Sequence, residues 1–370
     1  MASPLEGIRI ISLAHLYPGP FATMLLADMG ADVIIVEDRK VGDRTRRFPG
    51  HFESLNRNKR AVALNLKDSE DRQSFLKLVS TADVVVEGFR PGVMERLGLS
   101  VDEMRVHAPN LICVSISGYG QTGPMRTHGA HDLSLQAVAG LVRVTPGAEQ
   151  QTQMPDMVLS DIASAQSAVT GILAALLQRE RGGPAATVDV SMLDSIVSWM
   201  APYIVPAING LEPARLPPAD PGYGIFVSSD GVPFTISISA ENALWQRLCE
   251  IAGCQESALL LEEERIARRD FILPGLRAAL ASMSMSRIEQ EFVAAGIPHG
   301  PVRKLIEVRD DPQVRARGIF QDFVDPQTDD KLCYILQPIV FDGERGQIVR
   351  RAPRLGEHNR ELINADNSPD

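Results

Sequence analysis

Short apolar runs recur along the first half of the chain, and helix-like stretches separate them. Each run is the length of a buried strand and is largely uninterrupted by polar residues. Strands that alternate with helices at this spacing predict an α/β fold with a parallel, doubly wound sheet. The expected strands are Ile8–Leu13, Asp32–Val36, Ala61–Leu66, Asp83–Glu87, Leu111–Ser117 and Thr187–Val190.

The stretches between these runs have helical periodicity. Gly30 stands where a helix commonly ends, and Ser69 is a candidate N-cap. A long apolar stripe begins at Ile162, so we expect a helix directly after Asp161. The expected helices are Phe21–Met29, Ser69–Ser80, Val93–Leu97, Val101–His107, His131–Leu141, the one that begins after Asp161, and Leu193–Tyr203.

A proline-rich stretch at residues 202–221 is typical of a linker and divides the chain. We expect a large domain over residues 1–204, a small α+β domain over 222–320, and a C-terminal segment over 321–370 that returns to the large domain. In the small domain, Gly224–Val227 and Pro233–Ile238 predict two strands joined by a turn. Tyr334–Val340 is expected to form a strand, residues 145–156 a polar loop, and 365–370 a frayed end.

In a doubly wound sheet, ligands bind beyond the carboxyl ends of the strands. His15, Arg39, Phe89, Arg90 and the turn at 118–124 all come after expected strand ends, so they could share one crevice. The first β-α turn, at residues 15–20, lacks the G-x-G-x-x-G pattern that lets a backbone approach a pyrophosphate. Binding of NAD or FAD is therefore not expected.

Composition narrows the function classes. The 370 residues carry a net charge of −10, which argues against a nucleic-acid partner. The four cysteines have no metal-ligand spacing, so we expect no metal site and no disulfide, and a reducing cytoplasm. We expect neither a signal peptide nor an apolar run of about 18 residues that could span a membrane. Basic residues are concentrated at positions 39–60. This segment is either a solvated loop or a binding site for a phosphorylated small molecule.

The chemistry-bearing residues gather between positions 115 and 161. A glycine-rich turn (115–124) precedes His131 and Asp132, and Asp161 opens the long helix. His131 and Asp161 could act as acid and base on one substrate, or form a structural pair. Asp161 could equally be a plain N-cap, and Asp132 could orient His131 or cap the next helix. Glu241 is a helix-start residue or supports catalysis. The turn glycines, which tolerate positive φ, could aim backbone N–H groups at an oxyanion.

Several longer motifs resemble one family. The motifs occur along the chain in the same order as in that family. They are residues 5–13, Pro18-Gly-Pro-Phe-Ala-Thr with its continuation to Asp32, Leu55-Asn-Arg-Asn-Lys-Arg60, Phe89-Arg-Pro-Gly with its continuation to Gly98, Ser117-Gly-Tyr-Gly-Gln-Thr-Gly-Pro124, and Val190-Ser-Met-Leu-Asp194. Together they resemble the family III CoA-transferases, a group that also contains carnitine CoA-transferase-like proteins and α-methylacyl-CoA racemase. The resemblance covers most of residues 5–200 and continues more weakly afterwards.

The resemblance implies a Rossmann-like large domain and a small domain, with two chains interlocked as rings in a homodimer. It implies coenzyme A as substrate and product, with no permanently bound cofactor. Gly88 departs from the family, where an asparagine is common at this position. By matching positions, the CoA site would be lined by His15, Leu16, Arg39, Leu64, Phe89, Arg96, Leu97 and Arg126.

Two activities are compatible with the resemblance. In transferases the residue at the position of Asp161 is a nucleophile that carries CoA as an aspartyl thioester between an acyl-CoA donor and a carboxylic acid acceptor. In racemases a His and this Asp exchange the α-proton of a 2-methylacyl-CoA, and His131, Asp132, Asp161 and Glu241 match that set. Against a racemase, Asp161 is not succeeded by Phe-Gly-Gly. A transferase is the preferred hypothesis, and a non-catalytic acyl-CoA-binding protein is the third.

Overall fold

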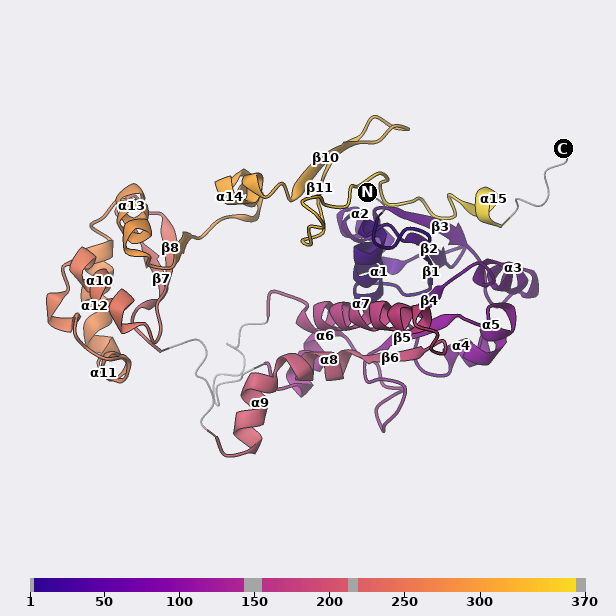
Figure 1. Cartoon of the computed structure of the whole chain (residues 1–370), viewed down its shortest axis with the longest axis horizontal. Helices are drawn as coiled ribbons and strands as arrows, with labels where there is room; N and C mark the ends of the chain where they lie inside the picture. Colours follow the sequence, from indigo (N-terminus) through magenta and orange to yellow (C-terminus); the bar gives the residue numbers. More distant parts are fainter. Residues whose placement is uncertain (1–2, 143–154, 212–218, 364–370) are drawn as a thin grey trace. The chain divides into compact units, whose positions relative to one another are not determined.

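The computed structural model describes residues 3–142, 155–211 and 219–363. The chain divides into two compact units, Met1–Ile204 together with Arg317–Asp370, and Val205–Ala316 (Figure 1). Most of the loop expected at 145–156 and all of the frayed end expected at 365–370 lie outside the described residues. The domain boundaries expected from the sequence stay a prediction.

The large unit is built on a six-stranded parallel sheet with the strand order β3-β2-β1-β4-β5-β6. This order is that of the doubly wound Rossmann fold, so the predicted fold class is confirmed. β1 lies at the centre, with Ile10 beside Val33 of β2 and Val84 of β4. The strands are β1 Arg9–Ser12, β2 Asp32–Glu37, β3 Lys59–Ala63, β4 Val84–Glu87, β5 Ile112–Ser117 and β6 Thr187–Ser191.

Most helices of the large unit match predicted ones with shifted ends, but the single helix expected over Leu193–Tyr203 is two helices, α8 and α9. α3 is capped by Asp68 and not by Ser69, because the Asp68 carboxylate accepts the N–H groups of Glu70 and Asp71. The basic run folds into short helices, and α9 extends into the stretch expected to be a linker. The helices are α1 Pro18–Asp28, η1 Arg44–Arg47, α2 Pro49–Asn56, α3 Ser69–Val79, α4 Val93–Arg96, α5 Val101–His107, α6 Asp132–Val138, α7 Leu159–Glu180, α8 Met192–Trp199 and α9 Ala201–Ile208.

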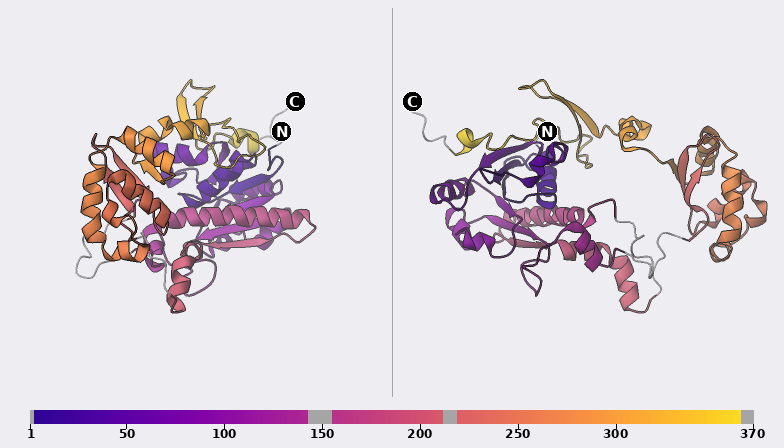
Figure 2. Two further views of the ribbon diagram at one scale, coloured as in Figure 1. Left: turned by 60° about the vertical axis from the view of Figure 1, so that its left-hand side comes forward. Right: turned by 180° about the vertical axis from the view of Figure 1, so that it is seen from behind.

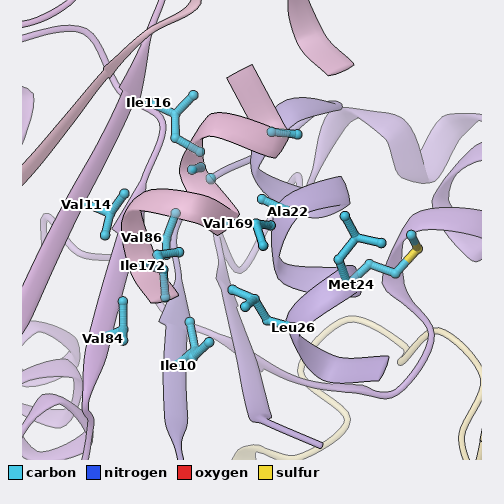
Figure 3. Packing of buried hydrophobic residues seen from close by; sticks show 14 of the residues in the cluster. Ile10, Ala22, Met24, Leu26, Val84, Val86, Val114, Ile116, Val169 and Ile172 are labelled. Carbon is cyan, nitrogen blue, oxygen red and sulfur yellow. The ribbon is translucent and has the colours of Figure 1, made fainter. Parts of the chain in front are cut away.

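Alternate residues of each central strand face opposite layers of the core. Ile10, Val86 and Ile116 point to one face and pack with residues of α1 and α7, among them Leu26 and Ile172 (Figure 3). The intervening residues of the same strands pack on the other face with α3 and α5. Because both faces are covered, the strands can be apolar throughout, as the sequence pattern indicated.

Helix α7 corrects one expectation. Its 22 residues are long and apolar enough to cross a membrane by length and composition, whereas no such stretch was expected. Half of its apolar window is nevertheless buried inside the protein, and Val169, Ile172 and Leu176 belong to the core of the large unit. The apolar stripe of α7 therefore has its partner in the sheet and α1.

The small unit has its own sheet and its own core. The predicted strand pair is present as antiparallel β7 and β8, and β9 adds a third strand. The elements of this unit are drawn in red and orange in Figure 2. Their separate apolar cluster includes the fully buried side chains of Trp245, Phe234 and Phe292. The elements are β7 Tyr223–Val227, β8 Pro233–Ser237, α10 Asn242–Ala252, η3 Gln255–Ser257, α11 Glu262–Ala267, α12 Arg269–Leu280, α13 Met285–Ala295, β9 His299–Pro301, η4 Leu305–Asp310 and α14 Pro312–Ala316.

The final segment packs on the large unit. It begins with the antiparallel hairpin of β10 (Phe320–Val324) and β11 (Lys331–Ile335), so the strand expected at Tyr334–Val340 is placed too late. It then runs beside β3 and ends in α15 (Asn359–Leu362). The backbone N–H of His358 donates to the Ala61 carbonyl at 3.0 Å, and the Asn359 side chain bonds both backbone groups of Ala63.

Candidate active site

A cavity of about 710 Å³ opens at the carboxyl ends of β1, β4 and β5. β1 lies between β2 and β4, so the chain runs to opposite sides of the sheet from this point, and ligands bind at such a switch point. The side chains that line the cavity come from the loops after these strands and from η1, α2, α6, α7 and α8. They include His15, Leu16, Tyr17, Arg44, Phe48, His51, Phe89, Arg90, Arg126, His128, His131, Asp161 and Met192.

Asp161 lies on the wall of this cavity. It is the third residue of α7, and Val158 is the N-cap, so the interpretation of Asp161 as a plain N-cap is wrong. Among the residues that the structure describes, no group hydrogen-bonds to its carboxylate. Burial raises its pKa to about 7, with a further contribution from the nearby charge of Asp132. A half-buried carboxylate with a pKa near neutrality can be a nucleophile or an acid/base group.

Asp132 ties the start of α6 to the start of α7. Its Oδ1 accepts the backbone N–H of Ser160 at 2.8 Å and the Ser160 hydroxyl at 2.7 Å. Its Oδ2 accepts the amide of Gln136, one helical turn further along α6. These bonds hold the residue next to Asp161 in place. Asp132 is the first residue of α6 and so does not act as its N-cap, and its bonds run to α7 and not to the His131 ring.

His131 is the N-cap residue of α6 and is exposed in the same cavity as Asp161. Among the described residues, no hydrogen bond joins its imidazole to Asp161 or to another side chain. The structure therefore brings His131 and Asp161 to one cavity, but does not make them a structural pair. Their catalytic roles stay predictions.

Tyr17 is a cavity residue that the sequence reasoning passed over. It comes shortly after β1, and its ring lies 5.6 Å from that of Phe21 and 5.7 Å from that of His51. Burial raises the pKa of its phenol, and the negative charge of Asp161 raises it further. The position of Tyr17 after the carboxyl end of the first strand could have predicted a place in the site, as the same position did for His15.

Four of the eight residues expected to bind CoA line the cavity, namely His15, Leu16, Phe89 and Arg126. The rings of His15 and Phe89 lie edge to face, 6.5 Å apart. The other four lie outside the lining. Arg39 pairs with Asp71, Leu64 is buried in the core, Arg96 is exposed at the end of α4, and Leu97 packs half-buried beside it.

Leu16 has a strained backbone at the cavity edge. Its φ of 71° lies in the left-handed region, which non-glycine residues rarely adopt. Its N–H donates to the buried Asp43 carboxylate at 3.1 Å, and the same carboxylate holds Thr45 at the start of η1. Such strain persists where the surroundings enforce it, commonly at ligand sites.

Glu241 lies in the small unit, where it precedes α10 and accepts the backbone N–H of Ser239 at 2.9 Å. This is the local helix-start arrangement that the sequence allowed, and a catalytic role stays a prediction. Within the described residues, no group of three or more His, Cys, Asp or Glu side chains could hold a metal ion.

The raised pKa of Asp161 predicts a pH-dependent rate. A carboxylate must be ionised to act as a nucleophile or a general base, and this one ionises only as the pH rises through about 7. The rate constant of a reaction that uses the ionised Asp161 carboxylate should therefore rise about 10-fold per pH unit below that pKa and level off above it. Single-turnover measurements between pH 5 and 9 test this. A rate that is already maximal at pH 5 would contradict it.

Comparison with known proteins shows the family of this chain. The family model for CoA-transferase family III matches residues 5–359. The chain is 34% identical to an acetyl-CoA:oxalate CoA-transferase of Acetobacter aceti, over 85% of each chain. It is 33% identical to a succinyl-CoA:mesaconate CoA-transferase of Haloarcula marismortui, over 97% of this chain and 95% of that protein.

Solved structures give the same result. The crystal structure of Rv3272 from Mycobacterium tuberculosis in its orthorhombic form matches with a TM-score of 0.85 and 31% identity, over 98% of this chain and 99% of that one. A CAIB/BAIF family protein from Brucella suis matches with a TM-score of 0.85 and 28% identity, over 99% of this chain and all of that one. The family resemblance carried by the sequence motifs is confirmed, and this chain belongs to CoA-transferase family III, a family of enzymes that transfer CoA.

Proposed function

We propose that this CoA-transferase moves CoA from an acyl-CoA donor to a carboxylic acid acceptor through a covalent aspartyl-CoA thioester on Asp161. The observation that supports the proposal is the Asp161 carboxylate, which faces the cavity without a hydrogen-bonding partner among the described residues and has a pKa raised to about 7. A carboxylate that no protein group engages remains available to form a covalent bond.

The first half-reaction has two steps. The Asp161 carboxylate attacks the acyl carbonyl of the donor, the C–S bond breaks, and CoA departs as a thiolate. The donor acyl group is now joined to Asp161 as a mixed anhydride. The thiolate then attacks the Asp161 carbonyl carbon, the anhydride C–O bond breaks, and the donor acid departs as a carboxylate. Asp161 now carries CoA as a thioester.

The second half-reaction reverses these steps with the acceptor. The acceptor carboxylate attacks the aspartyl thioester and releases the CoA thiolate, which then attacks the acceptor's acyl carbon. The new acyl-CoA forms, and the Asp161 carboxylate is regenerated. Neither half-reaction consumes a net proton.

Other groups in the cavity suit supporting roles. The N-terminal end of α7 favours negative charge near Asp161. Gly118 lines the cavity at the start of the glycine-rich turn, and its backbone N–H can donate to a developing oxyanion. We assign the binding of CoA to His15, Leu16, Phe89 and Arg126. Arg39 and Arg96 lie outside the cavity lining, where their guanidinium groups could bind the phosphates of CoA. Asp132 positions the helix that carries Asp161.

Hydroxylamine tests the covalent step. Incubation with an acyl-CoA and hydroxylamine should convert Asp161 to a hydroxamate and inactivate the enzyme, because hydroxylamine attacks the activated aspartyl carbonyl. Peptide mass spectrometry locates the modification, and omission of the acyl-CoA is the control. Modification of a different acid, or complete absence of modification with a panel of donors, would refute the assignment.

Racemisation is the second candidate, since His131 lies in the cavity with Asp161. It predicts loss of α-deuterium from a labelled 2-methylacyl-CoA into water without an acceptor. An exchange that needs no acceptor and leaves Asp161 unmodified by hydroxylamine would favour this activity over transfer.

We further propose that two chains form an interlocked homodimer in the cytoplasm. The chain leaves the large unit at Ile204 and returns at Arg317, as a closed ring requires. All four cysteines are thiols, which suits a reducing compartment. Sedimentation equilibrium at micromolar concentration should give the mass of two chains, and a monomer mass would refute the dimer.

A further inference from the structure

The cavity wall that carries Tyr17 also holds an arginine with no ionic partner among the described residues. Arg44 begins η1 and is exposed toward the cavity. The other two arginines of η1 have interaction partners. Arg46 forms a bidentate ion pair with Glu37, and the Arg47 guanidinium stacks on the Phe48 ring, 4.9 Å from its centre. No acidic side chain in the described part of the chain pairs with Arg44.

The fold holds η1 beside the loop that follows β1. Asp43 bonds the N–H of Leu16 on one side and Thr45 on the other, so Arg44 is fixed beside the loop that carries Tyr17. Further along the chain, His51 of α2 packs against the Tyr17 ring. The negative charge of Asp161 contributes to the raised pKa of the Tyr17 phenol. Arg44, Phe48 and His51 therefore form one wall with Tyr17.

The arginine assigned to CoA comes from a different segment. Arg126 belongs to the loop after β5, as do His128 and His131, and it also lines the cavity. Across residues 3–142, 155–211 and 219–363, no acidic side chain pairs with Arg126 either. Arg90 in the loop after β4 lines the cavity as well, so the cavity has guanidinium groups on three separate segments. Arg90 and Arg126 can hold CoA phosphates, while Arg44, on the wall with Tyr17, remains available to the acyl group.

We propose that Arg44 selects the acceptor by binding a second carboxylate, so that this enzyme prefers short aliphatic dicarboxylic acids to monocarboxylic acids. The inference rests on the proposed function. One carboxylate of the acceptor attacks the aspartyl thioester, and the distal carboxylate pairs with the Arg44 guanidinium, whose planar fork matches carboxylate geometry. The Phe48 and Tyr17 rings contact the methylene chain between the two carboxylates.

The test compares acceptors of matched chain length with one fixed donor, chosen as a donor that labels Asp161 in the hydroxylamine experiment. In the wild type, kcat/KM for succinate and glutarate should exceed that for butyrate and pentanoate by about 10- to 100-fold, the range of a charge-assisted hydrogen bond. Arg44→Gln should remove this preference by lowering only the dicarboxylate values. Arg44→Lys should keep part of it, because the positive charge remains.

Two variants serve as controls. Arg47→Gln removes a cation from the same short helix, and Arg47 does not itself line the cavity. Because its guanidinium stacks on Phe48, this control is read as the ratio of dicarboxylate to monocarboxylate kcat/KM, and that ratio should persist. Arg126→Gln should raise the KM of the donor and lower all acceptor values by the same factor. If Arg44→Gln also lowers all acceptors equally, Arg44 binds CoA and the inference is wrong. It is equally wrong if the wild type shows no dicarboxylate preference.

The hydroxylamine label separates the two proposals. Labelling of Asp161 needs only the donor, and a donor such as acetyl-CoA has no second carboxylate for Arg44 to bind. With this donor, Arg44→Gln should still be labelled at the wild-type rate. Normal labelling with an unchanged acceptor ratio would overturn the role of Arg44 alone. Absence of label in the wild type would overturn the covalent mechanism itself.

Discussion

Replacement of Asp161 by asparagine is expected to lower kcat by about 10⁴-fold or more, the scale of loss when a covalent nucleophile is removed. An amide of the same shape cannot form the anhydride or carry CoA. The expected loss concerns kcat, while the binding of CoA should persist because the assigned CoA contacts lie elsewhere in the cavity. Steady-state kinetics and calorimetric titration with CoA measure the two effects.

The same variant should not lose stability. Burial raises the pKa of Asp161 from 3.8 to about 7 in the folded protein, so the unfolded chain releases this proton more readily. The carboxylate therefore costs stability increasingly as the pH rises from about 4 to 7, and the full cost remains above 7. Asp161→Asn should unfold at higher urea concentration than the wild type at pH 8, and this advantage should shrink toward pH 5.

The matched control is Asp102→Asn. Asp102 is also an acid in the first turn of a helix, α5, but it is exposed and outside the cavity. Its replacement should leave kcat and its pH dependence unchanged. An Asp161→Asn enzyme that retains more than about a tenth of its kcat would exclude this residue as nucleophile.

Replacement of Arg265 by methionine is expected to destabilise the small unit by about 3–5 kcal/mol, because it leaves a buried carboxylate without its partner. Arg265 and Asp220 are both fully buried, and two guanidinium nitrogens bond the same carboxylate oxygen at 3.0 and 2.7 Å. The same guanidinium also bonds Asn242 and the carbonyls of Leu260 and Ser239. One side chain thereby joins the chain's entry into this unit to α10 and α11.

Urea unfolding monitored by Trp245 fluorescence reports on this effect, since Trp245 lies in the small-unit core next to the Arg265 guanidinium. The control is Arg287→Ala, which breaks an exposed pair with Glu291 one helical turn away and should cost at most about 0.5 kcal/mol. The double variant Asp220→Asn with Arg265→Met should recover part of the loss. Equal stability of Arg265→Met and Arg287→Ala would contradict the argument.

Local pattern was sufficient for most of the fold. The apolar runs identify the six parallel strands because both faces of this sheet are covered, and the turn at Ser229–Gly231 identifies the β7–β8 pair. The errors lie at element ends and in the basic run, part of which folds into η1 and α2. Two of its arginines pair with buried carboxylates, Arg46 with Glu37 and Arg57 with Asp28. The hairpin of β10 and β11 was missed because its alternation is short and carries charge.

The sequence by itself determined the family, the α/β class and the position of the carboxylate at the start of α7, since these depend on motifs and on the periodicity of neighbouring residues. Only the tertiary structure decided that Asp132 bonds Ser160 across 28 positions, and that Tyr17 and Arg44 lie on the cavity wall with Asp161. It alone decided the raised pKa of Asp161, because burial and a neighbouring charge come from segments that meet only after folding.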